Sequence, residues 1–134
     1  MISPQEALVY TMVAAAEADR DIAETEINLI GDLLNHLPIF RGLDRAAIAE
    51  MATRCSEMLG QGGGSDQVFG LIRQALPLPL RETAYALACD VIAVDSRLSR
   101  AELRILDRIR AHLQVDPAMA RAIERVAEVR FKAA

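Results

Sequence analysis

The chain carries the same short acidic pattern twice. The first copy covers residues 18–27 and the second covers residues 94–103, so that Asp19 corresponds to Asp95 and Glu26 to Glu102. The same spacing pairs further positions: Ile22 with Leu98, Ile30 with Leu106, Leu33 with Ile109, His36 with His112, and Leu37 with Leu113. A repeat of this length predicts two copies of one helix–corner–helix unit, facing each other across a pseudo-two-fold axis.

The composition predicts an all-α fold. The chain has 134 residues, of which 52% are hydrophobic, and we expect one domain over residues 1–134 with halves of roughly 1–60 and 66–134. Aromatic residues make up only 4% and tryptophan is absent, so the core must be built from Leu, Ile, Val, Met and Ala. These residues favour helices over strands.

Capping residues and apolar spacing predict a bundle of seven helices. Ser3 before Pro4 and Asp116 before Pro117 are typical helix starts, and Asp44 can cap another helix. The expected helices cover about residues 4–18, 24–37, 45–59, 66–76, 80–94, 100–113 and 117–131. The helix at 80–94 is apolar on nearly all sides, so we expect it at the centre of the bundle. The glycine-rich residues 60–65 are interpreted as a flexible linker, because no lysine follows them as in a phosphate-binding loop.

Charge and hydropathy argue against nucleic-acid and membrane partners. The net charge is −4, which discourages nucleic-acid binding. The longest apolar stretch, residues 7–16, is about half of what a spanning helix needs. Cys55 and Cys89 form neither a disulfide framework nor a metal-binding pair, so we expect reduced thiols in a cytoplasmic protein.

The two halves differ in charge, which bears on partners. Residues 1–40 hold seven acids and a single base, Arg20. The second unit is mixed, and Arg100, Arg104 and Arg108 fall on one helical face. This face is most simply a solvated stripe. It could instead dock onto the acidic half of another copy, giving a homo-oligomer, or onto an acidic protein partner.

The acidic corners are the clearest candidate site. In each copy the Asp ends one helix and the Glu lies in the first turn of the next, so four carboxylates, from Asp19, Glu26, Asp95 and Glu102, could converge and bind Ca²⁺ or Mg²⁺. The alternative is purely structural, because a Glu in a first turn meets the positive end of the helix dipole. Capping explains Glu102 well, whereas Glu26 has Ala23 at its capping position.

Other site chemistry finds little support in the sequence. There is no nucleophile signature or substrate-anchoring motif, so we expect a protein that is not an enzyme. An EF-hand is excluded because its required Gly and Glu positions hold Glu24 and Ile30. His36 and His112 each lie roughly 15 Å beyond the Glu of their copy, too far to join the acidic site, and suit helix C-termini.

Residues 18–26 and 94–102 resemble the duplicated pattern of the TerB tellurite-resistance family, apolar–Asp–Gly–x–apolar–Ser–x–x–Glu, with Arg20 and Ser96 in the glycine positions. That fold also resembles the N-terminal domain of membrane-anchored DnaJ-type co-chaperones. The resemblance implies a seven-helix bundle, a role in tellurite and general stress response, and acidic metal sites. The expected function is a non-enzymatic binding module. The alternative is a protein–protein interaction scaffold with structural acidic corners.

Overall fold

The computed structural model describes residues 1–17, 30–32, 34–93 and 100–132 of the chain, and within these ranges it contains helices and no strand. The expected all-α bundle is confirmed. The elements are α1 (Pro4–Ala16), a 3₁₀ turn η1 (Pro38–Phe40), α3 (Arg45–Leu59), α4 (Gly64–Ala75), α5 (Leu78–Ala93), α6 (Arg100–Leu113) and α7 (Pro117–Arg130). Residues 30–32 and 34–36 are also helical.

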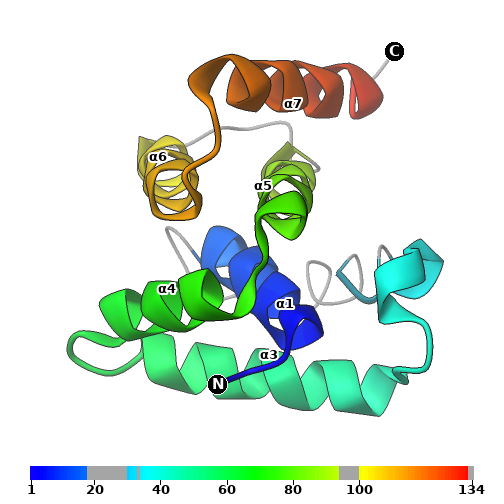
Figure 1. The fold of residues 1–134 in the computed structure, drawn as a ribbon, viewed down its shortest axis with the longest axis vertical. Helices are drawn as coiled ribbons and strands as arrows, with labels where there is room; N and C mark the ends of the chain where they lie inside the picture. Colours follow the sequence, from blue (N-terminus) through cyan, green and yellow to red (C-terminus); the bar gives the residue numbers. More distant parts are fainter. Residues whose placement is uncertain (18–29, 33, 94–99, 133–134) are drawn as a thin grey trace.

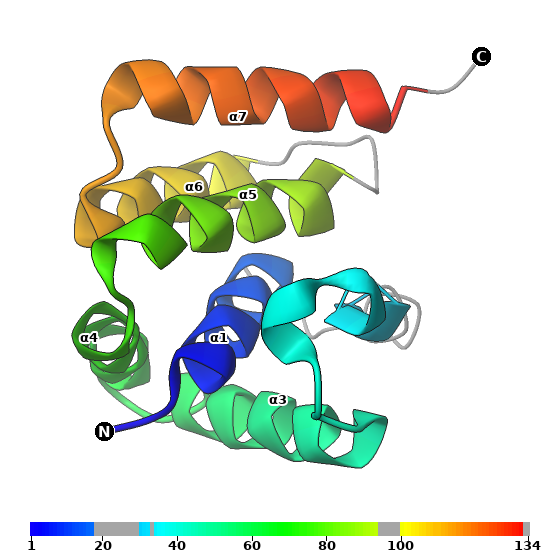
Figure 2. The ribbon, with the colours of Figure 1, turned by 45° about the vertical axis from the view of Figure 1, so that its right-hand side comes forward.

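The helices are stacked in layers (Figure 1). Figure 2 shows α7 along one edge, α5 and α6 side by side beneath it, then α1, and α3 at the opposite edge. Helix α1 contacts α3, α4, α5 and α6, so it connects the layers. Among the described residues, no helix has both the length and the apolar character needed to cross a membrane.

The centre of the bundle is α1. Every residue from Ala7 to Ala16 is buried, which is why this helix has apolar residues on all sides rather than along one stripe. Helix α5 is also largely buried over its second half, but its first turn exposes Leu78. The sequence pattern pointed to α5 as the central helix, whereas the structure encloses α1 more completely.

Three helix starts follow the capping residues read from the sequence. The Ser3 hydroxyl accepts from the backbone N–H of Glu6 at 3.1 Å, and Asp44 accepts from Ala47 at 2.8 Å. The Asp116 carboxylate accepts from the backbone N–H groups of residues 118 and 119. Each side chain satisfies a backbone donor that the helix itself leaves unpaired.

Two starts differ from the expectation. Helix α4 begins at Gly64 rather than Asp66, because residues 60–63 form a tight turn and residues 64 and 65 already belong to the helix, so that 60–65 is not a flexible linker. Gly63 has a φ of +74°, and a Cβ on buried Gly64 would lie 1.7 Å from the carbonyl oxygen of Met58. Helix α5 begins at Leu78 rather than Leu80, since Pro79 fits a first turn, where its missing N–H is not needed.

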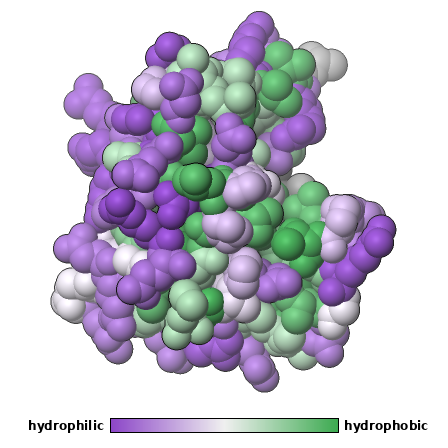
Figure 3. All heavy atoms as spheres, viewed as in Figure 1, coloured by the Kyte–Doolittle hydropathy of each residue, from purple (hydrophilic) through white to green (hydrophobic). Residues whose placement is uncertain are grey.

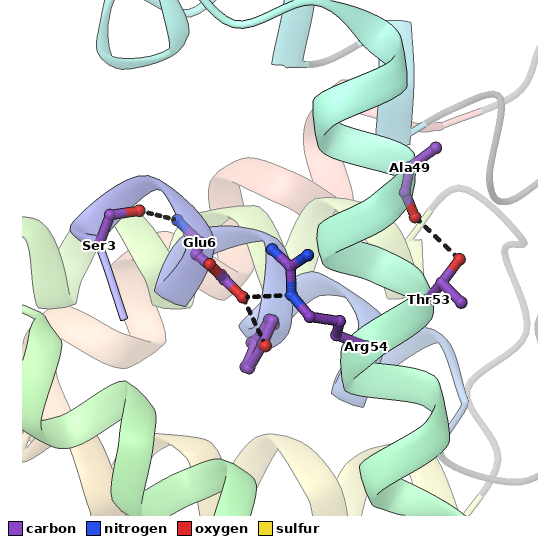
Figure 4. A network of polar contacts seen from close by, with 6 residues as sticks. Ser3, Glu6, Ala49, Thr53 and Arg54 are labelled. Carbon is purple, nitrogen blue, oxygen red and sulfur yellow. Dashed lines mark hydrogen bonds and ion pairs between the residues drawn. The ribbon is translucent and has the colours of Figure 1, made fainter. Parts of the chain in front are cut away.

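A polar network fastens α1 to α3 (Figure 4). The Glu6 carboxylate accepts from the Tyr10 hydroxyl at 2.6 Å and from Nε of Arg54 at 3.1 Å. Burial raises the pKa of Glu6, but the hydrogen bonds from Arg54 and Tyr10 outweigh it, so the pKa lies below its usual value of 4.5. Burial and this carboxylate raise the pKa of Tyr10 to about 12. The network therefore holds Glu6 in its ionised form.

Candidate functional site

Three of the four carboxylates expected at the acidic corners, those of Asp19, Glu26 and Asp95, lie outside the described residues. The fourth, Glu102, lies in the first turn of α6 and is half-buried. Convergence of the four groups, and the two-fold relation between the halves, therefore stay predictions. Across the described ranges, no three His, Cys, Asp or Glu side chains are grouped so that they could hold a metal ion.

Glu17 is an acidic residue next to the first corner that the repeat did not single out. It follows α1 directly as its C-terminal cap. Its Oε1 accepts from the Ser56 hydroxyl at 2.7 Å, while its Oε2 is buried and has no hydrogen-bond partner in the part of the chain that the structure describes. The residue at the equivalent position of the second copy is Ala93, so the duplication carried no signal for Glu17. Its place one residue before the repeat could have drawn attention to it.

A groove of about 480 Å³ lies between the second half of α5, the start of α6 and the second half of α7. Its apolar wall comes from all three helices and consists of Cys89, Ile92, Ala93, Leu103, Leu106, Ala127 and Phe131. Its polar residues, Glu124, Glu128 and Lys132, all come from α7 and the two residues after it. The volume falls in the range of small-molecule pockets, and the wall is mainly apolar.

Two polar contacts hold α7 against α5 beside this groove. The Tyr85 hydroxyl donates to Oε2 of Glu124 at 2.6 Å, and Arg130 forms an ion pair with Asp90. Asp90 is only 7% exposed, so its carboxylate depends on this guanidinium for compensation. Burial and the Glu124 contact raise the pKa of Tyr85, which keeps the phenol protonated. The groove therefore has a fixed wall on its α5–α7 side.

Burial opposes ionisation of Cys89, the cysteine of the groove. Burial is the largest of the effects that raise the pKa of Cys89 to about 12, and burial likewise raises that of Cys55 to about 12. A thiol must lose its proton to attack a substrate or bind a metal. Both cysteines are buried and reduced, as the sequence predicted.

One of the two histidines, His112, and one arginine of the stripe, Arg108, pack against α4. The ring of His112 stacks on Phe69 with centroids 4.8 Å apart and planes at 6°. Arg108, expected on a solvated stripe, lies with its guanidinium 4.9 Å from the Phe69 centroid and donates to the Ser65 hydroxyl at 2.8 Å. His112 is in the last turn of α6, as the dipole argument predicted. These contacts fasten α6 to α4.

The family to which the chain belongs is shown by a match that covers most of its sequence. Residues 5–128 match the family model described as tellurite resistance protein TerB. The chain belongs to the TerB family. No curated protein and no solved structure matches it.

The match extends from the first turn of α1 to the last turn of α7. The TerB domain thus includes both acidic corners, Glu17 and all three helices of the groove. The resemblance to co-chaperone N-terminal domains stays a prediction.

Proposed function

We propose that this TerB domain is a non-enzymatic module that binds a divalent cation, Ca²⁺ or Mg²⁺, at its acidic corners. The proposed ligands are the predicted Asp19, Glu26, Asp95 and Glu102. Family membership supports a role in resistance to tellurite and related chemical stress. We place the protein in the cytoplasm on the strength of its reduced cysteines.

The observation that carries the proposal is the unpaired oxygen of Glu17. A buried carboxylate oxygen without a hydrogen bond costs free energy, because it has lost water and gained no donor. A hard cation with oxygen ligands would offset this cost. Glu17 ends α1 immediately before the first corner, so its carboxylate is suited to extend the predicted ligand set. The acidic charge of residues 1–40 would favour a cation there as well.

Calorimetric titration of the whole chain with Ca²⁺, Mg²⁺, Mn²⁺ and Zn²⁺ tests this proposal. We expect binding of Ca²⁺ or Mg²⁺ and an increase in Tm with the same ion. The variants Glu17→Gln, Glu26→Gln and Glu102→Gln should each weaken the binding. The matched control is Glu57→Gln, which removes an exposed carboxylate of α3 and should bind like the wild type. Absence of heat and of a thermal shift with all four ions would contradict the proposal.

The second candidate function is a protein–protein interaction scaffold whose acidic corners are structural. The groove between α5, α6 and α7 favours it, because concave apolar surfaces are common at recognition sites. The stability of Glu26→Gln and of Glu102→Gln, measured without any ion, distinguishes the two functions. Under the scaffold hypothesis Glu102→Gln lowers the Tm through loss of capping, whereas Glu26→Gln changes it little.

A further inference from the structure

The groove between α5, α6 and α7 differs from the outward side of α7. Figure 3, in the orientation of Figure 1, shows apolar surface between polar side chains along the upper edge, where α7 lies. Single apolar residues exposed in this way are ordinary on a protein surface. The groove is instead bounded by three helices, and its volume of about 480 Å³ is that of a small-molecule site. Of these two surfaces, the groove is therefore the one shaped to enclose a ligand.

The charged side chains of the groove lie along one of its walls. Glu124 and Glu128 are one turn apart on α7, and Lys132 follows two residues after the end of that helix. The walls from α5 and α6 supply Cys89 and otherwise only apolar residues. A ligand in the groove would thus meet mainly apolar surface on two sides and charged groups on the third.

Glu124 is the charged residue that the fold holds in place. Its Oε2 accepts the 2.6 Å hydrogen bond from the Tyr85 hydroxyl, and Tyr85 is only 1% exposed. Glu124 is itself half-buried, whereas Glu128 and Lys132 are exposed. Burial and the hydrogen bond to Glu124 raise the pKa of Tyr85, so the phenol keeps its proton and remains the donor. The Glu124 carboxylate is thereby fixed before any ligand arrives, which lowers the entropic cost of binding.

The negative charge of Glu124 has no cationic partner among the residues that the structure describes. The ion pairs formed by the arginines of α7 are with other carboxylates, those of Glu128 and Asp90. Arg121 is exposed and outside the groove wall, and neither it nor Lys132 lies within ion-pair distance of Glu124. A carboxylate beside apolar walls has lost part of its hydration, and one bond to a neutral phenol does not cancel its charge. A cationic group of a ligand would compensate this charge through charge-assisted hydrogen bonds.

We propose that the groove binds a small molecule with an apolar body and one ammonium group, and that the ammonium pairs with Glu124. The apolar body would gain free energy by covering the walls from α5 and α6, while the ammonium would donate to the fixed carboxylate. A neutral ligand would leave the charge of Glu124 uncompensated, and a carboxylate ligand would be repelled by Glu124 and Glu128. The proposal uses none of the four carboxylates of the acidic corners, so it does not depend on cation binding there.

Three probes with the same apolar body test the proposal: octylamine, octanol and octanoate. Each is titrated at neutral pH into the isotope-labelled whole protein, and the NMR shifts of the backbone amides give both the affinity and the place of binding. We expect the amine to bind about tenfold more tightly than the alcohol, and the carboxylate to bind most weakly. The shifted signals should include Ile92, Leu103 and Ala127 of the groove. Equal affinities of amine and alcohol, absence of amine binding, or shifts confined to other residues would overturn the proposal.

Matched variants separate the charge from the apolar wall. Glu124→Gln keeps an oxygen that can accept from Tyr85, and it should reduce the affinity for the amine to that for the alcohol. Leu103→Ser, at a groove residue that is 50% exposed, should weaken binding of amine and alcohol alike, by about threefold or more. Glu57→Gln, at an exposed carboxylate of α3, should leave both affinities unchanged. Circular dichroism verifies that each variant folds. A preference for the amine that persists in Glu124→Gln, or that is lost in Glu57→Gln, would refute the assignment.

Discussion

The Tyr85 hydroxyl donates a 2.6 Å hydrogen bond to Glu124, joining two helices whose contributing residues are 39 positions apart in the chain. Tyr85 is almost fully buried, and Glu124 belongs to the wall of the groove. This contact and the ion pair between Asp90 and Arg130 fix α7 along α5, so α7 is held by polar contacts as well as by apolar packing. The groove depends on that placement.

Replacing Tyr85 by Phe should lower the free energy of unfolding by about 1.5–3 kcal/mol, the value typical of a hydrogen bond to a charged group. Urea denaturation measures the change. Combining Tyr85→Phe with Glu124→Gln in a double-mutant cycle isolates the contact, because part of each single effect comes from the partner left behind. A coupling energy near zero would show that the contact contributes nothing to the docking of α7.

Arg130→Gln should destabilise the protein more than Arg125→Gln. The first change leaves the buried Asp90 carboxylate without its cation and should cost about 1–3 kcal/mol. The second removes a pair between two exposed side chains and should cost about 0–1 kcal/mol. The two variants alter arginines of the same helix, so each serves as the control of the other. Equal Tm values would argue against the compensating role of Arg130.

Adding a methyl group should have opposite effects at two glycines of α4. In Gly64→Ala the new Cβ would collide with the carbonyl oxygen of Met58, so we expect a loss of about 1–3 kcal/mol. Gly70 lies inside the same helix, and apart from the backbone of α4 itself no described part of the chain lies within 4 Å of the added group, so Gly70→Ala should stabilise by about 0.5–1 kcal/mol. Thermal unfolding compares them. If both variants were tolerated equally, the close approach at residue 64 would be disproved.

The network around Glu6 predicts a pH dependence of stability. Because the pKa of Glu6 in the folded protein lies below its usual 4.5, its ionised form stabilises the fold fully above that value. The contribution is lost as the pH falls through the folded pKa. Glu6→Gln should therefore be less stable than the wild type at neutral pH, and the difference should shrink on acidification. Urea unfolding from about pH 7 down to about pH 3 measures it. A difference independent of pH would contradict the role of Glu6.

Local rules predicted much of the fold. Ser3, Asp44 and Asp116 start helices because a short polar side chain before an apolar repeat satisfies backbone donors, and this chemistry is local. The start of α4 was wrong by two residues because Gly64 is determined by contact with the preceding helix, not by its neighbours. Likewise, the central place of α1 depends on which helices cover it. Because α1 and α5 are both apolar on nearly all sides, their sequence patterns alone do not tell which of the two is buried more completely.

The candidate site was less predictable. The acidic repeat identified four carboxylates, but only Glu102 lies within the described part of the chain. Glu17 had no counterpart in the second copy, and its unpaired oxygen is apparent only from the packing of α1 against Ser56. The groove combines residues of α5, α6 and α7 that share no sequence pattern. The exposed apolar residues of α7, Met119, Val126 and Val129, do share a helical spacing, but their exposure depends on which side of the helix meets α5.

The complete enclosure of α1 has a consequence for the order in which the protein acquires its structure. This helix is synthesised before all those that cover it, and α5, which packs broadly against it, ends only at Ala93. Until that point has left the ribosome, α1 can pack only against α3 and α4, and the apolar side that it turns to α5 is open to chaperones or to aggregation. The nascent chain therefore cannot complete its interior before α5 has emerged.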